Sequence, residues 1–303
     1  MAANDDGPAL RPLHRLLSRY RITQAKGFSL KHHDPADTAH LNSDDKPEAR
    51  EWLAAGIQWL GRQQDMLYAQ DRWSLLVVLQ AMDAAGKDSA IKHVMSGVNP
   101  QGVQVTSFKQ PSSEELDHDF LWRCGKALPE RGRIGIFNRS YYEDVLVVRV
   151  HPETLAAQKL PAELIGPKLW DQRHQDIRQF EQHLTRNGTV VLKFFLNVSR
   201  DEQKRRFLER IDEADKHWKF SAADVHEREH WDNYMAAYED AIRATASATS
   251  PWFVVPADNK WFTRLIVVAA IVEALSALKL HYPQPDADRR AELDAARAEL
   301  RRD

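Results

Sequence analysis

The sequence predicts an α/β protein in three layers, with a central parallel five-stranded sheet between helices. Short apolar runs rich in Val, Leu, Ile and Phe alternate with segments of helical periodicity, which is typical of a doubly wound parallel sheet. The run 189–198 is almost continuously apolar, as expected for a strand buried on both faces. The polar residues considered below follow the ends of these strands, where open α/β sheets bind ligands.

Local patterns place the individual elements. Apolar residues recur at helical spacing from Trp52, and Ser112 with Glu115 three residues later forms a capping box that begins a helix. Asn187-Gly188 is a typical helix end. In chain order we expect a helix at 48–70, a strand at 75–79, a helix at 89–98, a strand at 103–108, a helix at 112–127, strands at 133–137 and 189–198 around a helix at 167–186, a strand at 252–255 and a helix at 261–280.

Composition shifts divide the chain into three parts. Residues 1–47 carry Pro and Asp clusters and are expected to form an irregular N-terminal arm. Residues 48–285 form one α/β domain that includes a basic segment at about 200–225. Residues 286–303 form a charged, Ala-rich tail, expected to be a solvated helix.

Charge and cysteine content narrow the class of protein. The 303 residues have a formal net charge of −2, which argues against a globally basic nucleic-acid binder. The single Cys124 permits no intrachain disulfide and fits a reducing compartment. The N-terminal stretch has no apolar core of signal-peptide type, and the longest apolar run, 265–272, is too short to span a bilayer. We therefore expect a cytoplasmic protein without a membrane partner.

The junction after the first expected strand resembles a phosphate-binding loop. A small-residue loop at 81–86 ends in Gly86-Lys87 and leads into a helix, so that backbone N–H groups and a lysine face one anion. The usual pattern, G-x-x-x-x-G-K-[ST], is broken twice, by Ala81 and by Asp88. The alternative is an ordinary strand-to-helix turn with a surface lysine.

Asp83 within this loop indicates that a metal ion or a phosphate acceptor lies beside the phosphates. A carboxylate beside phosphates costs free energy unless a divalent cation lies between them or the carboxylate orients an incoming acceptor. The alternative is a helix N-cap, a position that Asp favours. Ser89 does not replace the missing hydroxyl at position 88, because one residue further along a helix turns the side chain by about 100°.

The third expected strand ends at a second group of polar residues. Asn138 stands where a magnesium-holding Asp is usual, and Arg139 follows, suited to stabilising charge on a transferring phosphate. Carboxylates come shortly after, at Glu143 and Asp144. The alternative for these acids is a first helical turn that complements the helix dipole.

A basic segment follows the fourth strand and is expected to act as a mobile lid. It contains Arg206 and Arg210 on one helix face, because they are four residues apart. The alternative is a solvated helix paired with Glu202 and Glu209. The basic residues are Lys204, Arg205, Arg206, Arg210, Lys216 and Lys219.

These motifs occur in the same order in the polyphosphate kinase 2 family, which the chain resembles from about residue 28 to 282. The resemblance rests on DAAGKDSAIKHVMSGVNPQGVQV, on FNRSYYEDVLVVRV and on the run SRDEQKRRF with the HWKF that follows it. It implies a P-loop kinase fold like that of thymidylate kinase, with a helical lid. It also implies transfer of phosphate between inorganic polyphosphate and an adenine nucleotide.

The resemblance carries roles onto individual residues. Asp83, Lys87 and Arg139 match the family's loop aspartate, loop lysine and strand-end arginine, while Arg206, Arg210 and Lys219 match basic residues of the lid. Many members have Asp-Arg-Ser followed by Trp-Tyr-Asn-Arg, whereas this chain has Asn138-Arg139-Ser140 followed by Tyr-Tyr-Glu-Asp. This version resembles the class III subgroup that accepts AMP as well as ADP.

The candidate site therefore has two sets of residues, with Mg²⁺ or Mn²⁺ as the implied cofactor and a homodimer or homotetramer as the implied assembly. The catalytic set is Asp83, Lys87, Arg139 and Glu143, of which Asp83 and Glu143 are expected to hold the metal. The set expected to bind phosphate or nucleotide is Ala84, Ala85, Gly86, Asp88, Ser89, Asn138, Arg206, Arg210 and Lys219.

Two other functions remain open at this stage. One is an ATP-dependent nucleoside monophosphate kinase of the same architecture. The other is a nucleotide-binding protein with a degraded loop, which Ala81 and Asp88 favour. A zinc-protease signature, H-E-x-x-H, also occurs from His226 to His230. Charges flank it, and His217 or His183 would supply the third ligand only by an accident of folding.

Overall fold

A six-stranded, mainly parallel sheet forms the centre of the molecule. The structure, a computed structural model, describes residues 11–302. The strand order is β1-β6-β5-β2-β4-β3, in which β1 is antiparallel to β6 and the other pairs are parallel. The strands are β1 (Arg21–Ile22), β2 (Ser74–Gln80), β3 (Val103–Ser107), β4 (Ile134–Asn138), β5 (Thr189–Asn197) and β6 (Trp252–Pro256).

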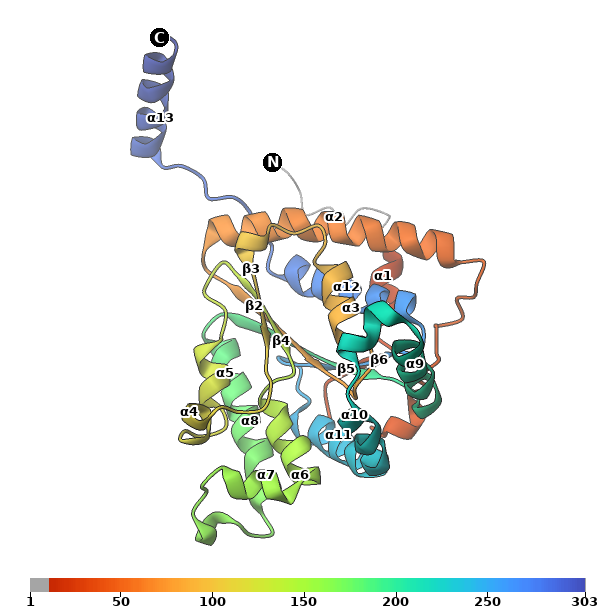
Figure 1. The fold of residues 1–303 in the computed structure, drawn as a ribbon. Helices are drawn as coiled ribbons and strands as arrows, with labels where there is room; N and C mark the ends of the chain where they lie inside the picture. The colour runs from red at the N-terminus through yellow and green to blue at the C-terminus, as the bar shows by residue number, and fades with distance from the viewer. Residues whose placement is uncertain (1–10, 303) are drawn as a thin grey trace.

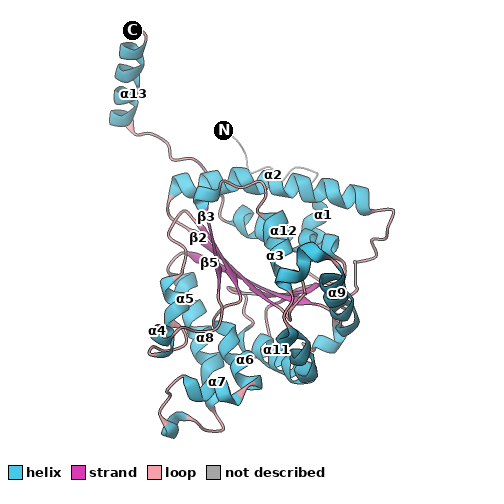
Figure 2. Ribbon diagram, viewed as in Figure 1, coloured by secondary structure: helices cyan, strands magenta, loops and turns pink. Residues whose placement is uncertain are grey.

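Helices cover both faces of this sheet (Figures 1 and 2). The apolar helix α12 packs on β5 and β6 and is itself covered by α1, α2 and α3, whereas α8 lies against β5 on the other face, with α11 beside it. The longer helices are α2 (Lys46–Gln70), α3 (Lys87–Val94), α8 (Leu169–Arg186), α9 (Arg200–Asp212), α11 (Trp231–Thr245), α12 (Lys260–Ala277) and α13 (Ala287–Leu300). The shorter ones are α1 (Arg11–Leu17), α4 (Ser113–Leu116), α5 (Trp122–Lys126), α6 (Val147–Val150), α7 (Pro152–Ala157) and α10 (Ala222–His226).

The sheet has one strand more than the sequence predicts, because the N-terminal arm takes part in the fold. Leu13, Leu17 and Tyr20 are buried in the core, and β1 then pairs with β6 through Arg21 opposite Phe253. The expectation of an irregular arm is therefore wrong for this part of it. The sequence did not predict α1 and β1 because polar residues separate the few apolar residues that they bury.

The helix expected at 112–127 is broken into α4 and α5. Ser112 and Glu115 form the predicted capping box, but the helix ends at Leu116. Asp119 then accepts a hydrogen bond from the backbone N–H of Leu121 at 2.9 Å. Such a local bond competes with helical hydrogen bonding, which explains the break.

The C-terminal tail forms the exposed helix α13, which projects from the body of the molecule (Figure 1). The side chain of Asp286 caps it by accepting a hydrogen bond from the N–H of Arg289 at 2.8 Å. Within residues 11–302, no helix combines the length and apolar character needed to cross a membrane.

Candidate active site

The phosphate loop, residues 81–86, connects β2 to α3 at the carboxyl end of the sheet. Its backbone takes left-handed conformations at Ala84 (φ 60°) and Gly86 (φ 108°), so that the turn is tight and α3 begins directly at Lys87. Gly86 suits this position because residues with a side chain rarely adopt such a φ. The loop thus presents its backbone to the start of a helix, which is the arrangement that binds phosphate in other proteins.

Lys87 is buried beneath the loop and closes it. Its Nζ donates to the carbonyl oxygens of Ala81 at 2.9 Å and Met82 at 3.4 Å. Burial, with the nearby positive charge of Arg139, lowers the pKa of Lys87 to about 8, against the opposing effect of Asp83, Glu143 and other carboxylates. The amine is therefore positively charged at neutral pH and lies at the centre of the loop.

Arg139 joins the two predicted catalytic carboxylates. Its Nη2 donates to Oδ1 of Asp83 at 2.6 Å, and its Nη1 donates to Oε2 of Glu143 at 3.0 Å. Glu143 and Asp83 raise the pKa of Arg139 despite its burial. The residue holds a left-handed backbone with φ 64°, a strained conformation that is common at functional sites. The four catalytic candidates are thus in one cluster.

Asn138, one residue earlier, makes a parallel connection to the start of α3. Its Nδ2 donates to Oδ1 of Asp88 at 2.7 Å. The hydroxyl of Ser89 instead accepts a hydrogen bond from Nη2 of Arg264 on α12 at 2.9 Å. Consecutive residues of β4 and the turn after it therefore each hold one carboxylate of the loop and helix.

Arg206 does not take the position expected of a mobile lid residue. It is buried, and all five guanidinium N–H groups are used: Nε donates to Glu202, Nη1 to the carbonyls of Ala84 and Ala85, and Nη2 to those of Ala257 and Asp258. In this structure Arg206 is an anchor that fixes the phosphate loop to α9 and to the end of β6.

Gln203 shares this anchoring role, which the sequence alone did not predict. It lies three residues before Arg206 on α9, and its Nε2 donates to the backbone carbonyl of Asp83 at 2.9 Å. Its own Oε1 accepts from Arg228 at 2.6 Å. The i, i+3 spacing with Arg206 is the signal that places both side chains on one helix face.

Arg210 and Lys216 of the basic segment, with Lys260 of α12, line a pocket of about 570 Å³ over the loop. Arg210 lies 3.9 Å from Asp224 of α10 and stacks on Phe207. The side chain of Lys219 lies outside the part of the chain that the structure describes. Besides the loop residues, the pocket is lined by Lys87, Asp88, Ser89, Asn138, Arg139, Arg206, Glu209, Arg210, Lys216, Trp218, Phe220, Ser221, Asp224 and Lys260.

A second pocket, of about 780 Å³, adjoins the first through Arg139. Phe108, Val147 and Val148 give it apolar walls, while Arg139 and Glu143 lie at the side shared with the phosphate loop. The two pockets thus meet at the cluster of catalytic candidates. A donor in one and an acceptor in the other would have Arg139 between them.

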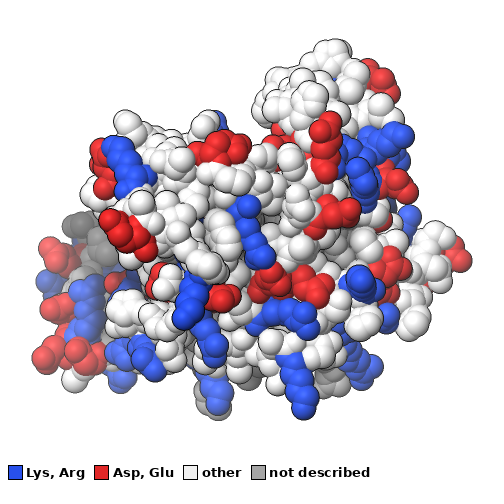
Figure 3. Space-filling model, turned by 90° about the horizontal axis from the view of Figure 1, so that it is seen from below, with Lys and Arg blue, Asp and Glu red and all other residues white. Residues whose placement is uncertain are grey.

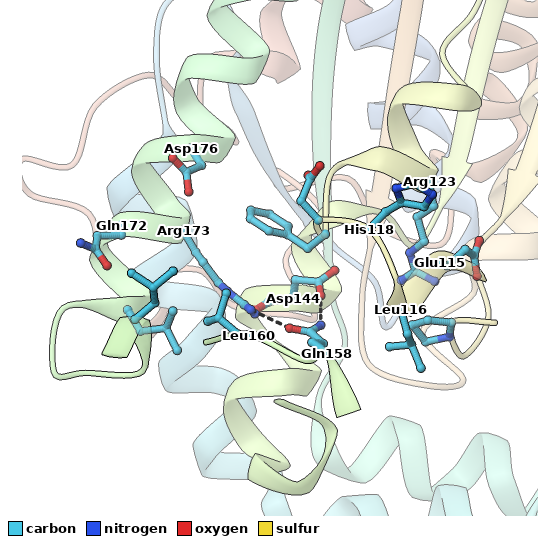
Figure 4. Close-up of a pocket in the computed structure, with 15 residues that line it drawn as sticks. Glu115, Leu116, His118, Arg123, Asp144, Gln158, Leu160, Gln172, Arg173 and Asp176 are labelled. Carbon is cyan, nitrogen blue, oxygen red and sulfur yellow. Dashed lines mark hydrogen bonds between the residues drawn. The ribbon is translucent and has the colours of Figure 1, made fainter. Parts of the chain in front are cut away.

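Asp144 separates this second pocket from a third of about 430 Å³ (Figure 4). Its Oδ1 accepts from Nε2 of Gln158 at 2.5 Å, and Oε1 of Gln158 accepts from Arg173 at 2.6 Å. Burial raises the pKa of Asp144 to about 6, against the opposing effect of Arg123 and Arg173. Asp144 therefore binds Gln158 and forms part of the wall between the two pockets.

Tyr141 and Tyr142 hold the segment that carries Arg139 and Glu143. Both hydroxyls donate to Oε1 of Glu181 on α8, at 3.0 and 2.8 Å. The other oxygen of Glu181 accepts from Lys193 of β5 at 2.6 Å, in a fully buried ion pair. This network ties the end of β4 to the helix and the strand beneath it.

Comparisons with known proteins now identify the family. Residues 41–283 match the model of the polyphosphate kinase 2 (PPK2) family. The chain is 54% identical over 258 residues to an ADP-polyphosphate phosphotransferase of Rhodopseudomonas palustris, an alignment covering 85% of this chain and 89% of the relative. The chain belongs to the polyphosphate kinase 2 family.

Two further relatives agree with this assignment. An AMP/ADP-polyphosphate phosphotransferase of Meiothermus ruber is 44% identical over 270 residues, covering 89% of this chain and 97% of the relative. The crystal structure of polyphosphate kinase 2 from Arthrobacter aurescens superposes with a TM-score of 0.82 at 41% identity, covering 92% of this chain and 95% of that one. The resemblance predicted from the motifs is confirmed, and every candidate site residue falls within the PPK2 match.

The H-E-x-x-H segment does not form the helical pair of a zinc site in this PPK2 chain. α10 ends at His226, and Glu227–His230 is a 3₁₀ helix, so the two histidines do not lie on one continuous α-helix. His226 is largely exposed, whereas the ring of His230 packs against His151 at 5.0 Å. Across the described residues 11–302, no three His, Cys, Asp or Glu side chains are grouped as metal ligands.

The surface charge is mixed on one face of the molecule. Over the face seen from below, basic and acidic side chains are interspersed (Figure 3).

Proposed function

We propose that this chain transfers the terminal phosphate of inorganic polyphosphate to AMP and to ADP. The observation that carries the proposal is that Arg139 lies where two pockets meet. One pocket contains the phosphate loop and the basic residues of α9, and fits a polyanionic donor. The other has apolar walls and fits an adenine nucleotide. The activities named for the two relatives, at 54% and 44% identity, support the same reaction.

The reaction asks mainly for alignment and charge stabilisation. The bond between the terminal phosphorus and its bridging oxygen breaks, and a bond forms between that phosphorus and a phosphate oxygen of the nucleotide. Lys87 and the loop amides hold donor phosphates, and Arg139 stabilises charge on the phosphate in transit. Asp83 and Glu143 fix the guanidinium of Arg139 in place, as their 2.6 and 3.0 Å hydrogen bonds indicate.

The residues present suit a magnesium or manganese ion. Carboxylate oxygens are the protein ligands that Mg²⁺ prefers, usually one or two of them together with substrate phosphates. Asp83 and Glu143 converge on a single guanidinium, which brings their oxygens within reach of one small region. We propose these two as metal-binding residues, with the cation supplying neutralisation of phosphate charge when bound.

A donor comparison tests the proposal. Purified protein is incubated with AMP and MgCl₂, and either polyphosphate or ATP is added as the donor, with nucleotides separated by chromatography. The proposal expects ADP and then ATP from polyphosphate alone. ADP formation with ATP but not with polyphosphate would instead show a nucleoside monophosphate kinase, and nucleotide binding without turnover on either donor would show a binding protein.

Assembly and location are further parts of the proposal. The family resemblance implies a homodimer or homotetramer, and the single buried Cys124 fits a reducing cytoplasm. Light scattering coupled to size-exclusion chromatography tests the first, and cell fractionation tests the second.

A further inference from the structure

The end of β4 contacts two carboxylates through two consecutive residues. Arg139 holds Asp83 in an ion pair, and Asn138 holds Asp88 through a neutral amide donor at 2.7 Å. Both connections span from β4 to the phosphate loop or to the first turn of α3. They differ in charge, because the first carboxylate is neutralised by its partner and the second is not.

The pair of Asp88 and Asn138 departs from the usual phosphate loop at both positions. In P-loop phosphotransferases the residue after the lysine supplies a hydroxyl, and a strand-end Asp supplies a carboxylate, and both serve the magnesium ion. Here the residue after Lys87 carries the carboxylate and the strand end carries an amide. The two positions together still carry one negative charge, but it lies on residue 88 rather than on residue 138.

The other polar groups around the loop also have partners in the structure, each through one atom. Glu143 and Asp83 both bind Arg139, and the hydroxyl of Ser89 accepts a hydrogen bond from Arg264. Asp88 is exposed and lines the 570 Å³ pocket together with Lys87. Lys87 is the positive charge that interacts with Asp88, and it also faces the donor phosphates, so a carboxylate at this position costs free energy through like-charge repulsion unless a further cation lies between it and the phosphates.

We propose that Asp88 is a metal-facing carboxylate of the donor site and that Asn138 is its positioning residue. Asn138 fixes Oδ1 of Asp88, and Oδ2 would then serve as the ligand of a Mg²⁺ ion that accompanies the donor phosphates. This inference rests on the proposed function for the identity of the donor. It adds to the roles of Asp83 and Glu143, which lie on the Arg139 side of the cluster.

Calorimetric unfolding with tripolyphosphate, with and without MgCl₂ and without any acceptor, tests the inference. In wild type, magnesium increases the rise in Tm that tripolyphosphate causes. In Asp88→Asn we expect the apparent affinity for tripolyphosphate with magnesium to fall at least tenfold. Without magnesium it should equal or exceed the wild-type value, because a repelling charge is gone. This reversal is not expected of a damaged fold.

An exchange of the two side chains tests the positioning role. Asp88→Asn combined with Asn138→Asp moves the carboxylate to the other end of the same hydrogen bond while keeping the shape of the pair. We expect the double variant to regain the magnesium effect to within about threefold of wild type. Asp65→Asn, an exposed carboxylate on α2, is the control for loss of one negative charge and should keep the full effect.

Two results would overturn the inference. An undiminished magnesium effect in Asp88→Asn would remove Asp88 from the metal site. Failure of the double exchange to recover the effect, with unliganded Tm unchanged, would remove Asn138 as its partner. Failure of the proposed function is distinguished by the wild type itself, which would then show no transfer from polyphosphate to AMP.

Discussion

The Nη2 atom of Arg139 lies 2.6 Å from Oδ1 of Asp83 and so joins the turn after β4 to the phosphate loop. Glu143 holds the other arm of the same guanidinium. The geometry needs a planar fork with two separate donors, which arginine has and lysine lacks. The position of the Arg139 guanidinium therefore depends on both carboxylates.

Arg139→Lys should therefore lose most activity although it keeps the charge. A single ammonium does not reproduce the fork, and loss of one preorganised charge donor costs about 10²–10³-fold in kcat. Steady-state kinetics with polyphosphate and AMP measures the effect, with the Tm of each variant as the folding control. A kcat within a few-fold of wild type would show that the fork is dispensable.

Loss of the proton from Lys87 should lower the activity at alkaline pH. Because its folded pKa is about 8, kcat/KM for polyphosphate should fall as pH rises through that value. Stability should respond with the opposite sign, since between pH 8 and the unfolded pKa of 10.5 the unfolded chain binds more protons. Lys87→Arg should lack the alkaline fall in its pH profile.

The control for this profile is Lys92→Arg, an exposed lysine on the same helix, which should keep the fall near pH 8. An unchanged profile in Lys87→Arg would assign the titration to another group.

Arg206 should contribute more to the stability of the fold than to the binding of polyphosphate. Arg206→Met leaves loop carbonyls and Glu202 without a buried partner, so we expect a loss of about 3–5 kcal/mol in the free energy of unfolding. Urea denaturation measures it. Arg205→Met is the matched control, because Arg205 is exposed and pairs with Glu202 and Glu209 on the surface, where loss costs about 0–1 kcal/mol.

A mobile lid residue would behave in the reverse way. Were Arg206→Met to raise the KM for polyphosphate while leaving the free energy of unfolding unchanged, the anchoring role would be wrong.

Asp144 should make the protein less stable as pH rises from about 4 to about 6. The pKa of its carboxyl is about 6 in the fold and 3.8 in the unfolded chain, so the folded chain holds the extra proton in that window. Two pKa units correspond to about 3 kcal/mol, which is lost by pH 7. Asp144→Asn should remove this slope when Tm is measured from pH 4 to 7, and a slope equal to that of wild type would contradict the shift.

The parts predicted well from sequence are those with local signals. Continuous apolar runs mark the strands, and Gly86-Lys87 between a strand and a helix marks the phosphate loop. The strand β1 escaped prediction because its partner Phe253 lies far along the chain and its own two residues carry no pattern. Pairing across such a distance is decided by tertiary contacts.

The anchoring role of Arg206 was hidden for a related reason. Its charge pattern is that of any solvated helix, and what distinguishes it is the set of backbone carbonyls from two distant segments that its donors reach. The meeting of two pockets at Arg139 likewise depends on how distant segments pack, which no local sequence pattern shows.

The most direct measurement is ³¹P NMR of a mixture of polyphosphate, AMP and MgCl₂ without ATP, with wild type, Lys87→Met and Lys92→Met in parallel. We expect wild type and Lys92→Met to convert terminal phosphate of polyphosphate into the β-phosphate of ADP, and we expect Lys87→Met to be slower by orders of magnitude while remaining folded. No ADP with wild type, or ADP at the wild-type rate with Lys87→Met, would contradict the proposed phosphate transfer.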